Sequence, residues 1–375
     1  MVGTKVTKAL LCTEGGLSFL VKLAFFDNFA SCFMENIHEL KSLLQFPKEI
    51  VITTHRNPDG DAIGSSLALM LYLRKLGHSV SVISPSEYPA MLSWMPGIQD
   101  IVIYDLDPEK SKALMNKAEL VFCLDFNSLD RIDKVGELIP MDRVTVVMID
   151  HHLFPEPFAQ YILSDTMASS TAELVFDFIH RLGDGKQIDR VIAESIFTGI
   201  LTDTGSFKYS TSSRLFRVVG DLLELGVDDY KLQDLIFNSL EEKNLRLLGH
   251  CLANRMEILH EYHTGLITLT KDDYVNFDIQ RGDTEGIVNY LLKLKDVRLA
   301  AFITEQPTIV KISLRSKGNF SVQDLAKKYF KGGGHKNAAG GASFKGLDAT
   351  VKKFKRVLPL YKEQLTDTAL FNQSI

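Results

Sequence analysis

The sequence is poor in cysteine, and its four cysteines show neither paired nor metal-binding spacing: Cys12, Cys32, Cys123 and Cys251. This spacing excludes a disulfide framework and favours a reducing compartment, which we expect to be the cytoplasm. Long hydrophobic runs are missing too. The most apolar stretch near the start, residues 17–26, contains Lys22 and is too short to span a membrane, so we expect no membrane partner.

Excess positive charge is also absent, since 47 acidic residues outnumber 42 Lys and Arg residues and give a net charge of -5. This balance excludes a protein that coats long duplex nucleic acid through a broad basic surface. The same net charge is compatible with a small anionic ligand that a few basic residues bind. The chain has 375 residues, of which 45% are hydrophobic and 24% are charged, as in ordinary globular proteins. Because this length exceeds one usual core, we expect two domains.

The run Met148-Ile149-Asp150-His151-His152 places an acid and two imidazoles at the end of a predicted buried strand. Polar groups are costly there unless they serve a purpose, and metal coordination is one such purpose. The sequence therefore predicts that other metal ligands follow other strands.

Further acids and one imidazole lie at comparable positions. His55, Asp59 and Asp61 occupy a loop between a predicted strand at residues 50–53 and a predicted helix at residues 62–76. Asp125 directly follows the apolar run at residues 120–124, and Asp203 lies where a helical pattern breaks.

Strands that end in acids and alternate with helical patterns predict an α/β fold with a parallel sheet. In such sheets ligands bind beyond the carboxyl ends of the strands. His55, Asp125 and His151 fall at three predicted carboxyl ends, so one crevice could collect them. Because several acids in one crevice repel one another unless cations neutralise them, the pattern points to two metal ions.

Five motifs, in this order along the chain, resemble those of the DHH phosphoesterases and of the DHH-associated C-terminal domain. They are His55-Arg56-Asn57-Pro58-Asp59-Gly60-Asp61-Ala62, the lone Asp125, Asp150-His151-His152, Thr202-Asp203-Thr204-Gly205 and Gly332-Gly333-Gly334-His335-Lys336-Asn337-Ala338-Ala339-Gly340-Gly341. The resemblance spans residues 34 to 360, and within the family the layout is most similar to the NrnA-type oligoribonucleases.

The resemblance implies metal-binding roles for six residues. One ion would be held by His55 and Asp59, the other by Asp61, His151 and Asp203, while Asp125 would bridge the two. The ions would be Mn²⁺, although other divalent cations suit the same mixture of imidazole and carboxylate. The implied catalytic residues are Asp150, which would orient a ligand imidazole, and His152, which would face the substrate phosphate.

A second group of residues near the C-terminus is suited to binding an anion. The glycines at 332–334 let backbone amides approach an anion closely, and a guanidinium such as that of Arg315 can grip a phosphate through two hydrogen bonds. By resemblance, Arg315, Gly333, Gly334 and His335 would bind the phosphate of the substrate.

We expect four segments along the chain. Residues 1–33 form an extension, which we interpret as an over-extended start outside the fold, so that its removal leaves activity intact. Residues 34–226 form the catalytic parallel-sheet domain and residues 227–257 a helical linker. Residues 258–365 form a smaller mixed α/β domain, and the resemblance implies a substrate cleft between the two domains.

The resemblance implies a manganese-dependent phosphohydrolase that uses a metal-activated water. It would degrade very short oligoribonucleotides to mononucleotides and dephosphorylate 3′-phosphoadenosine 5′-phosphate (pAp). One alternative is a phosphodiesterase that cleaves the linear dinucleotide pApA in cyclic dinucleotide turnover. A non-enzymatic nucleotide-binding regulator is disfavoured because all six ligands are present. A homodimer is left open, since no sequence feature fixes an interface.

Overall fold

The computed structural model describes residues 37–238, 240–280 and 282–372 of the chain. These residues form two compact units. The first contains the chain up to Arg56 together with residues 61–86 and 100–225, and the second contains residues 57–60, 87–99 and the chain from Gly226 onward. The extension expected at residues 1–33 lies outside the described residues.

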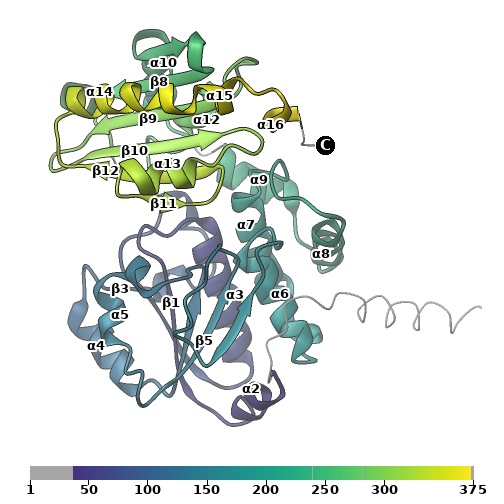
Figure 1. The fold of residues 1–375 in the computed structure, drawn as a ribbon. Helices are drawn as coiled ribbons and strands as arrows, with labels where there is room; N and C mark the ends of the chain where they lie inside the picture. The colour runs from purple at the N-terminus through teal and green to yellow at the C-terminus, as the bar shows by residue number, and fades with distance from the viewer. Residues whose placement is uncertain (1–36, 239, 281, 373–375) are drawn as a thin grey trace, which may run out of the picture. The chain divides into compact units, whose positions relative to one another are not determined.

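The first unit is built on a six-stranded sheet in the order β3-β2-β1-β4-β5-β6, and all neighbouring strands are parallel (Figure 1). The strands are β1 (Glu49–Thr54), β2 (Ser79–Ser84), β3 (Val102–Ile103), β4 (Leu120–Leu124), β5 (Thr145–Asp150) and β6 (Tyr161–Ser164). Every residue of β4 is buried, as expected of a strand that is covered on both faces. The predicted parallel α/β fold is confirmed.

Helices cover both faces of this sheet. The helices of this unit are α2 (Ile37–Leu43), α3 (Gly60–Lys75), α4 (Pro108–Lys117), α5 (Lys134–Leu138), α6 (Thr171–Arg181), α7 (Arg190–Asp203) and α8 (Ser213–Glu224). On one face, Met115 of α4 and Val135 of α5 belong to a core cluster with Val121 of β4. The next residue of β4, Phe122, points to the opposite face, where its ring meets Phe178 of α6 edge-on at 5.9 Å. The sheet is therefore the middle layer of the unit.

The second unit contains a six-stranded mixed sheet in the order β11-β12-β10-β9-β8-β7. The strands are β7 (Met256–Leu259), β8 (Thr264–Leu269), β9 (Leu299–Glu305), β10 (Val310–Ser316), β11 (Gly333–Gly334) and β12 (Ala338–Ser343). The pair β8 and β9 is parallel and the other neighbours are antiparallel. This mixed sheet agrees with the α/β character predicted for the C-terminal part.

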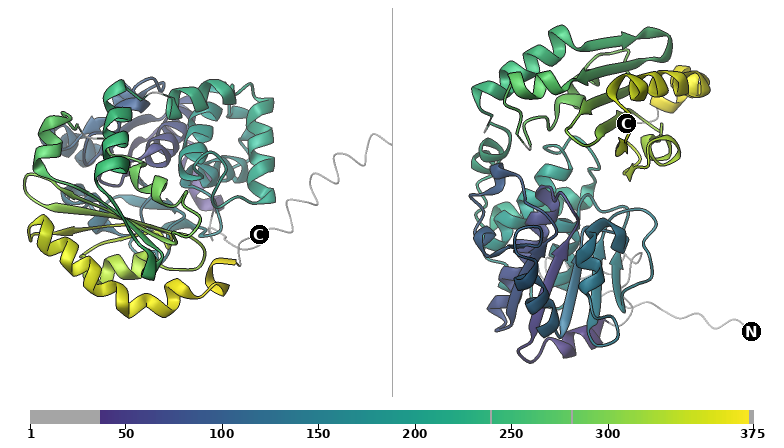
Figure 2. Two further views of the ribbon diagram at one scale, coloured as in Figure 1. Left: turned by 90° about the horizontal axis from the view of Figure 1, so that it is seen from above. Right: turned by 90° about the vertical axis from the view of Figure 1, so that its left-hand side faces the viewer.

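Helices also pack on both faces of the second sheet (Figure 2). The helices of this unit are α9 (Asp229–Phe237), α10 (Glu242–Asn254), α11 (Lys271–Asn276), α12 (Ile287–Leu291), α13 (Val322–Tyr329), α14 (Leu347–Val357), α15 (Lys362–Thr366) and α16 (Ala369–Asn372). Leu325 of α13 and Phe354 of α14 share one apolar cluster with the sheet, and Leu247 of α10 and Ile287 of α12 share the other. The helices α9 and α10 lie within residues 227–257, where the sequence predicted a helical segment, and the role of that segment as a linker stays a prediction.

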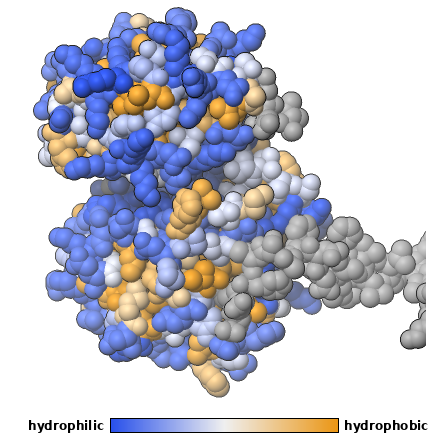
Figure 3. All heavy atoms as spheres, viewed as in Figure 1, coloured by the Kyte–Doolittle hydropathy of each residue, from blue (hydrophilic) through white to orange (hydrophobic). Residues whose placement is uncertain are grey.

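Among the described residues, no helix is both long enough and apolar enough to cross a membrane. On the face drawn in Figure 3, hydrophilic residues surround smaller groups of apolar ones. Scattered apolar residues of this kind are normal on a protein surface and need no special explanation.

Candidate metal centre

The carboxyl ends of three neighbouring strands bring several predicted ligands together. The parallel registers align Thr54 of β1, Leu124 of β4 and Ile149 of β5. The residues that follow these positions, His55, Asp125 and Asp150, therefore lie along one edge of the sheet. The register of the parallel strands therefore explains why the strand-end motifs lie at one edge of the sheet, where ligands bind in folds of this type.

Asp125 occupies the middle of this edge and is only 2% exposed. Its backbone is left-handed, with φ of 65°, and its amide donates to the carbonyl of Ile149 at 3.1 Å. Its two carboxylate oxygens face different imidazoles. Oδ2 lies 3.4 Å from Nε2 of His55, and Oδ1 lies 3.6 Å from Nε2 of His151. Oδ1 also lies 3.7 Å from Nδ1 of His152, so the two oxygens of one carboxylate face imidazoles on different sides, as those of a bridging ligand would.

Three imidazoles at this edge each place Nδ1 beside an oxygen that can accept its proton. The acceptors are the carbonyl of Arg56 for His55 at 2.9 Å, the carbonyl of Ala168 for His151 at 3.4 Å and Oδ1 of Asp150 for His152 at 2.7 Å. Donation from Nδ1 would leave the lone pair of each ring on Nε2, which is the usual tautomer of histidines that bind metals.

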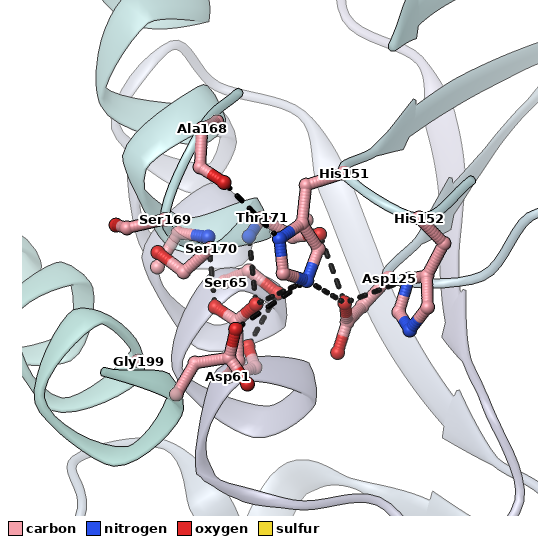
Figure 4. Close-up of polar contacts among 12 residues, drawn as sticks. Asp61, Ser65, Asp125, His151, His152, Ala168, Ser169, Ser170, Thr171 and Gly199 are labelled. Atoms are coloured by element: carbon pink, nitrogen blue, oxygen red, sulfur yellow. Dashed lines mark hydrogen bonds and ion pairs between the residues drawn. The ribbon is translucent and has the colours of Figure 1, made fainter. Parts of the chain in front are cut away.

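Asp61 and Asp203 lie on the other side of His151. Asp61 is in the first turn of α3, and Asp203 is the last residue of α7. Nε2 of His151 lies 3.9 Å from Oδ2 of Asp61 and 3.5 Å from Oδ2 of Asp203. Figure 4 shows Asp61 close to Gly199 of α7, where a Cβ atom would lie 2.8 Å from Oδ1 of Asp61. A glycine at 199 is therefore what lets α7 approach the centre.

The spacing of these donor atoms fits divalent metal ions. Separations of 3.4 to 3.9 Å between imidazole nitrogen and carboxylate oxygen are too long for good hydrogen bonds. Two ligands that lie about 2.1 Å from one ion stand roughly 3 to 3.5 Å apart. The donors of Asp61, His151 and Asp203 all lie within 4.8 Å of one another. Carboxylate and neutral imidazole together suit several divalent cations, so the residues present fit a metal centre.

The charges of the cluster also favour a cation. Burial opposes ionisation of Asp125, but the close approach of His55 and the charges of His152, His55 and His151 hold its pKa below the usual range. Burial lowers the pKa of His151, whereas Asp125, Asp61 and Asp150 raise it, and the net result is a raised pKa. The carboxylates therefore stabilise positive charge at their centre, whether it is a proton on His151 or a bound cation.

The carboxylate of Asp150 supports His152, whereas we expected it to support the ligand His151. Oδ1 accepts from the His152 ring at 2.7 Å, and Oδ2 accepts from the His152 amide at 3.1 Å. The physical reason is the period of an extended chain, in which residues two apart point to the same side and adjacent residues to opposite sides. His152 consequently has the firmest support of the three imidazoles.

Asp59 lies on the short loop between β1 and α3, as predicted from the Pro-Asp-Gly turn. The preceding Asn57 has φ of 55°, which is a conformation that asparagine tolerates and that helps to make the turn tight. The role of Asp59 as a metal ligand stays a prediction.

In the second unit, the predicted phosphate-binding residues come together on neighbouring strands. Arg315 of β10 pairs with Ala338 of β12, and the amide of His335 donates to the carbonyl of the same Ala338 at 2.7 Å. Gly333 and Gly334 form β11, which pairs with β12. A guanidinium, an imidazole and a glycine strand thus lie around one hairpin, and their role in binding phosphate stays a prediction, as does the substrate cleft.

The sequence-based prediction missed the first turn of α6. Thr171 and Ala172 donate their amides to Asp61, at 2.6 and 2.8 Å, and the Thr171 hydroxyl donates to Asp125 at 2.9 Å. The only signal in the sequence is the pattern Ser170-x-x-Glu173, which is typical of a helix start. That pattern predicts a helix start but does not reveal which acids meet it.

Known proteins are similar to this chain in both units. The chain matches the DHH family, N-terminal domain, over residues 49–200 and the DHHA1 domain over residues 267–365. It is 34% identical over 320 residues to the bifunctional oligoribonuclease and PAP phosphatase NrnA of Thermus thermophilus, covering 84% of this chain and 90% of that protein. It is 25% identical over 314 residues to the cyclic-di-AMP phosphodiesterase PdeA of Listeria monocytogenes, covering 80% and 46%. The crystal structure of an exopolyphosphatase-related protein from Bacteroides fragilis aligns with a TM-score of 0.87 at 40% identity, covering 90% of this chain and 99% of that one.

Proposed function

The chain belongs to the DHH family, and on that premise we propose that it is a metal-dependent phosphoesterase that degrades very short oligoribonucleotides and dephosphorylates pAp. The observation that carries the proposal is the Asp125 carboxylate, whose two oxygens face His55 and His151 separately. Such a centre suits hydrolysis of a phosphate ester, because charge that builds on phosphoryl oxygens needs fixed positive charge beside it.

We assign the metal ligands as the resemblance implied. His55 and Asp59 would hold one Mn²⁺, Asp61, His151 and Asp203 the other, and Asp125 would bridge them. When bound, such ions polarise a phosphoryl oxygen and lower the pKa of a water molecule at neutral pH. The identity of the metal as manganese and the count of two ions are part of this proposal.

His152 would contact the substrate phosphate. Its Nδ1 lies 2.7 Å from Oδ1 of Asp150, and we assign Nε2 as the atom that would meet a phosphoryl oxygen. With its ring bonded to Asp150 and only 5% of its surface exposed, the imidazole is fixed before substrate arrives. Fixed groups of this kind need no reorganisation during the reaction, which favours turnover.

In the second unit, Arg315, Gly333, Gly334 and His335 would bind another phosphate of the substrate. The guanidinium supplies charge and two parallel donors, and glycine amides admit close approach of an anion. We propose residues 34–226 as the catalytic domain, 227–257 as a helical linker and 258–365 as the domain that binds substrate. A cytoplasmic location and a short RNA or nucleotide substrate belong to the same proposal.

A second candidate activity is cleavage of the linear dinucleotide pApA. It is supported by the similarity to the Listeria cyclic-di-AMP phosphodiesterase, although this chain covers only 46% of that protein. Both activities would use the same metal centre, so substrate preference must separate them.

The deciding experiment compares hydrolysis of pAp, pApA, a five-nucleotide RNA and pyrophosphate by one Mn²⁺-loaded preparation. We expect pAp and the short RNAs to be cleaved and pyrophosphate to be spared. Asp125→Ala should abolish turnover, whereas Asp130→Ala, which changes an exposed acid near the same strand, should not. Preference for pyrophosphate, or normal rates in Asp125→Ala, would overturn the proposal.

A further inference from the structure

The first turn of α6 contacts ligands that come from three different parts of the first unit. The amides of Thr171 and Ala172 donate to Oδ2 and Oδ1 of Asp61, at 2.6 and 2.8 Å. The carbonyl of Ala168, just before the helix, lies 3.4 Å from Nδ1 of His151. Figure 4 shows residues 168–171 of this segment above Asp61 and beside His151. One short segment therefore sets the positions of several groups at once.

The side chain of Thr171 adds a contact to Asp125. Its hydroxyl donates to Oδ1 at 2.9 Å, and this is the oxygen that faces Nε2 of His151. The backbone of Asp125 is already fixed by its bond to Ile149, so the remaining freedom of its carboxylate is rotation of the side chain. The Thr171 hydroxyl, which is fully buried, restricts that rotation.

This contact cannot be explained as helix capping. The start of a helix has unpaired N–H donors and therefore needs acceptors. Ser170 supplies one by accepting from the amide of Glu173 at 3.1 Å, and Asp61 supplies two more. The hydroxyl of Thr171 donates, so it satisfies nothing in the helix. Its effect is on the orientation of Asp125.

An ion pair between a buried carboxylate and a partly exposed guanidinium supports the turn. Oε2 of Glu173 accepts from the amide of Ser169 at 2.7 Å, and its Oε1 lies 3.5 Å from Nε of Arg214 on α8. Glu173 is 1% exposed, and a neighbouring cation offsets the cost of burying its carboxylate. Arg214 also pairs with Asp165 at 3.3 Å and with Asp177. Through these ion pairs, Arg214 of α8 contacts Asp165, Glu173 and Asp177.

We propose that Thr171 is a positioning residue of the metal centre and that the Glu173–Arg214 pair holds the turn that carries it. The inference rests on the proposed function, because it assumes that Asp125 and its neighbours bind cations. Thr171 itself would not bind a cation or touch the substrate. It would set the angle at which Oδ1 of Asp125 meets the ion on the His151 side.

The test is a set of full-length variants examined by Mn²⁺ titration, by EPR of bound Mn²⁺ and by steady-state kinetics on pAp. Thr171→Val keeps the shape and removes the donor, and it should weaken Mn²⁺ binding on the order of tenfold to a hundredfold. Thr171→Ser keeps the hydroxyl and should restore most of the affinity and the EPR spectrum. Thr198→Val is the matched control, because that buried hydroxyl only returns to the carbonyl of Glu194 at 2.8 Å.

The variant Arg214→Gln leaves every proposed ligand in place and should also weaken Mn²⁺ binding. It keeps the inference testable even if Thr171→Val fails to fold. Wild-type affinity in folded Thr171→Val, or in Arg214→Gln, would overturn the inference while leaving the proposed function intact. A wild-type protein that binds no divalent cation would overturn both.

Discussion

The three glycines of the Gly332–Gly334 run should respond very differently to replacement by alanine. At Gly332 a Cβ atom would overlap the carbonyl oxygen of Gly340 on the paired strand. At Gly334 it would lie 2.6 Å from the carbonyl oxygen of Ala338, and φ there is +132°. At Gly333 no heavy atom lies within 4 Å. The structure thus requires glycine at 332 and 334 for the hairpin itself and leaves position 333 open.

The cost of each change follows from these distances. The obstructing atoms at 332 and 334 are backbone atoms, so β11 and β12 would have to separate, at about 1 to 3 kcal/mol for the overlap. The unfavourable φ at Gly334 adds roughly 1 to 2 kcal/mol. Gly333→Ala should change the free energy of unfolding by less than about 1 kcal/mol and can stabilise the fold by restricting the unfolded chain.

Urea unfolding followed by circular dichroism measures these differences, and kinetics on pAp then test the binding role of Gly333. If its amide meets a phosphate, the added methyl group of Gly333→Ala should raise KM while the free energy of unfolding stays near that of the wild type. Equal destabilisation of Gly333→Ala and Gly334→Ala would refute the structural reasoning. An unchanged KM in stable Gly333→Ala would refute the phosphate-binding role.

Three further predictions concern the metal centre. Asp150→Asn weakens the support of His152, so kcat should fall at least about tenfold with little change in Mn²⁺ affinity; an unchanged kcat would contradict this role. Burial lowers the pKa of His151 but the carboxylates raise it overall, and a cation must displace its proton. Mn²⁺ affinity measured by calorimetry should therefore rise with pH up to that raised pKa and level off above it, whereas a flat profile between about pH 6 and 8 would argue against His151 as a ligand. Gly199→Ala should destabilise the fold and weaken Mn²⁺ binding together, because its methyl group would lie 2.5 Å from Cβ of Ala172 and 2.8 Å from Oδ1 of Asp61, and wild-type thermal unfolding would exclude these clashes.

The strand-end part of the centre was predictable because local patterns encode it. His55 and Asp125 each follow a short apolar run, and such runs predict strand ends without knowledge of the fold. A parallel sheet then brings neighbouring carboxyl ends to one edge. No long-range information was needed beyond the choice of sheet type.

The contacts of α6 were not predictable in this way. Thr171 is 110 residues from Asp61 and 46 residues from Asp125 along the chain, so no local pattern links them. The partner of Asp150 was predicted wrongly for the opposite reason. Its proximity to His151 in sequence suggested a contact, but the alternation of an extended chain directs its carboxylate to His152.

Asp61 illustrates how one residue can serve the fold and the chemistry together. Its two oxygens accept the first amides of α6, and a helix start stabilises negative charge just as a cation does. The helix and the proposed ion therefore favour the same ionised, fixed carboxylate, and Asp61 is held in place before any metal binds. A substitution of Asp61 would disturb both the start of α6 and the metal centre. A loss of activity in such a variant would therefore not show which of the two effects caused it. Asp125, whose oxygens face His55 and His151 and which contacts α6 through the Thr171 hydroxyl, reports on the centre more directly.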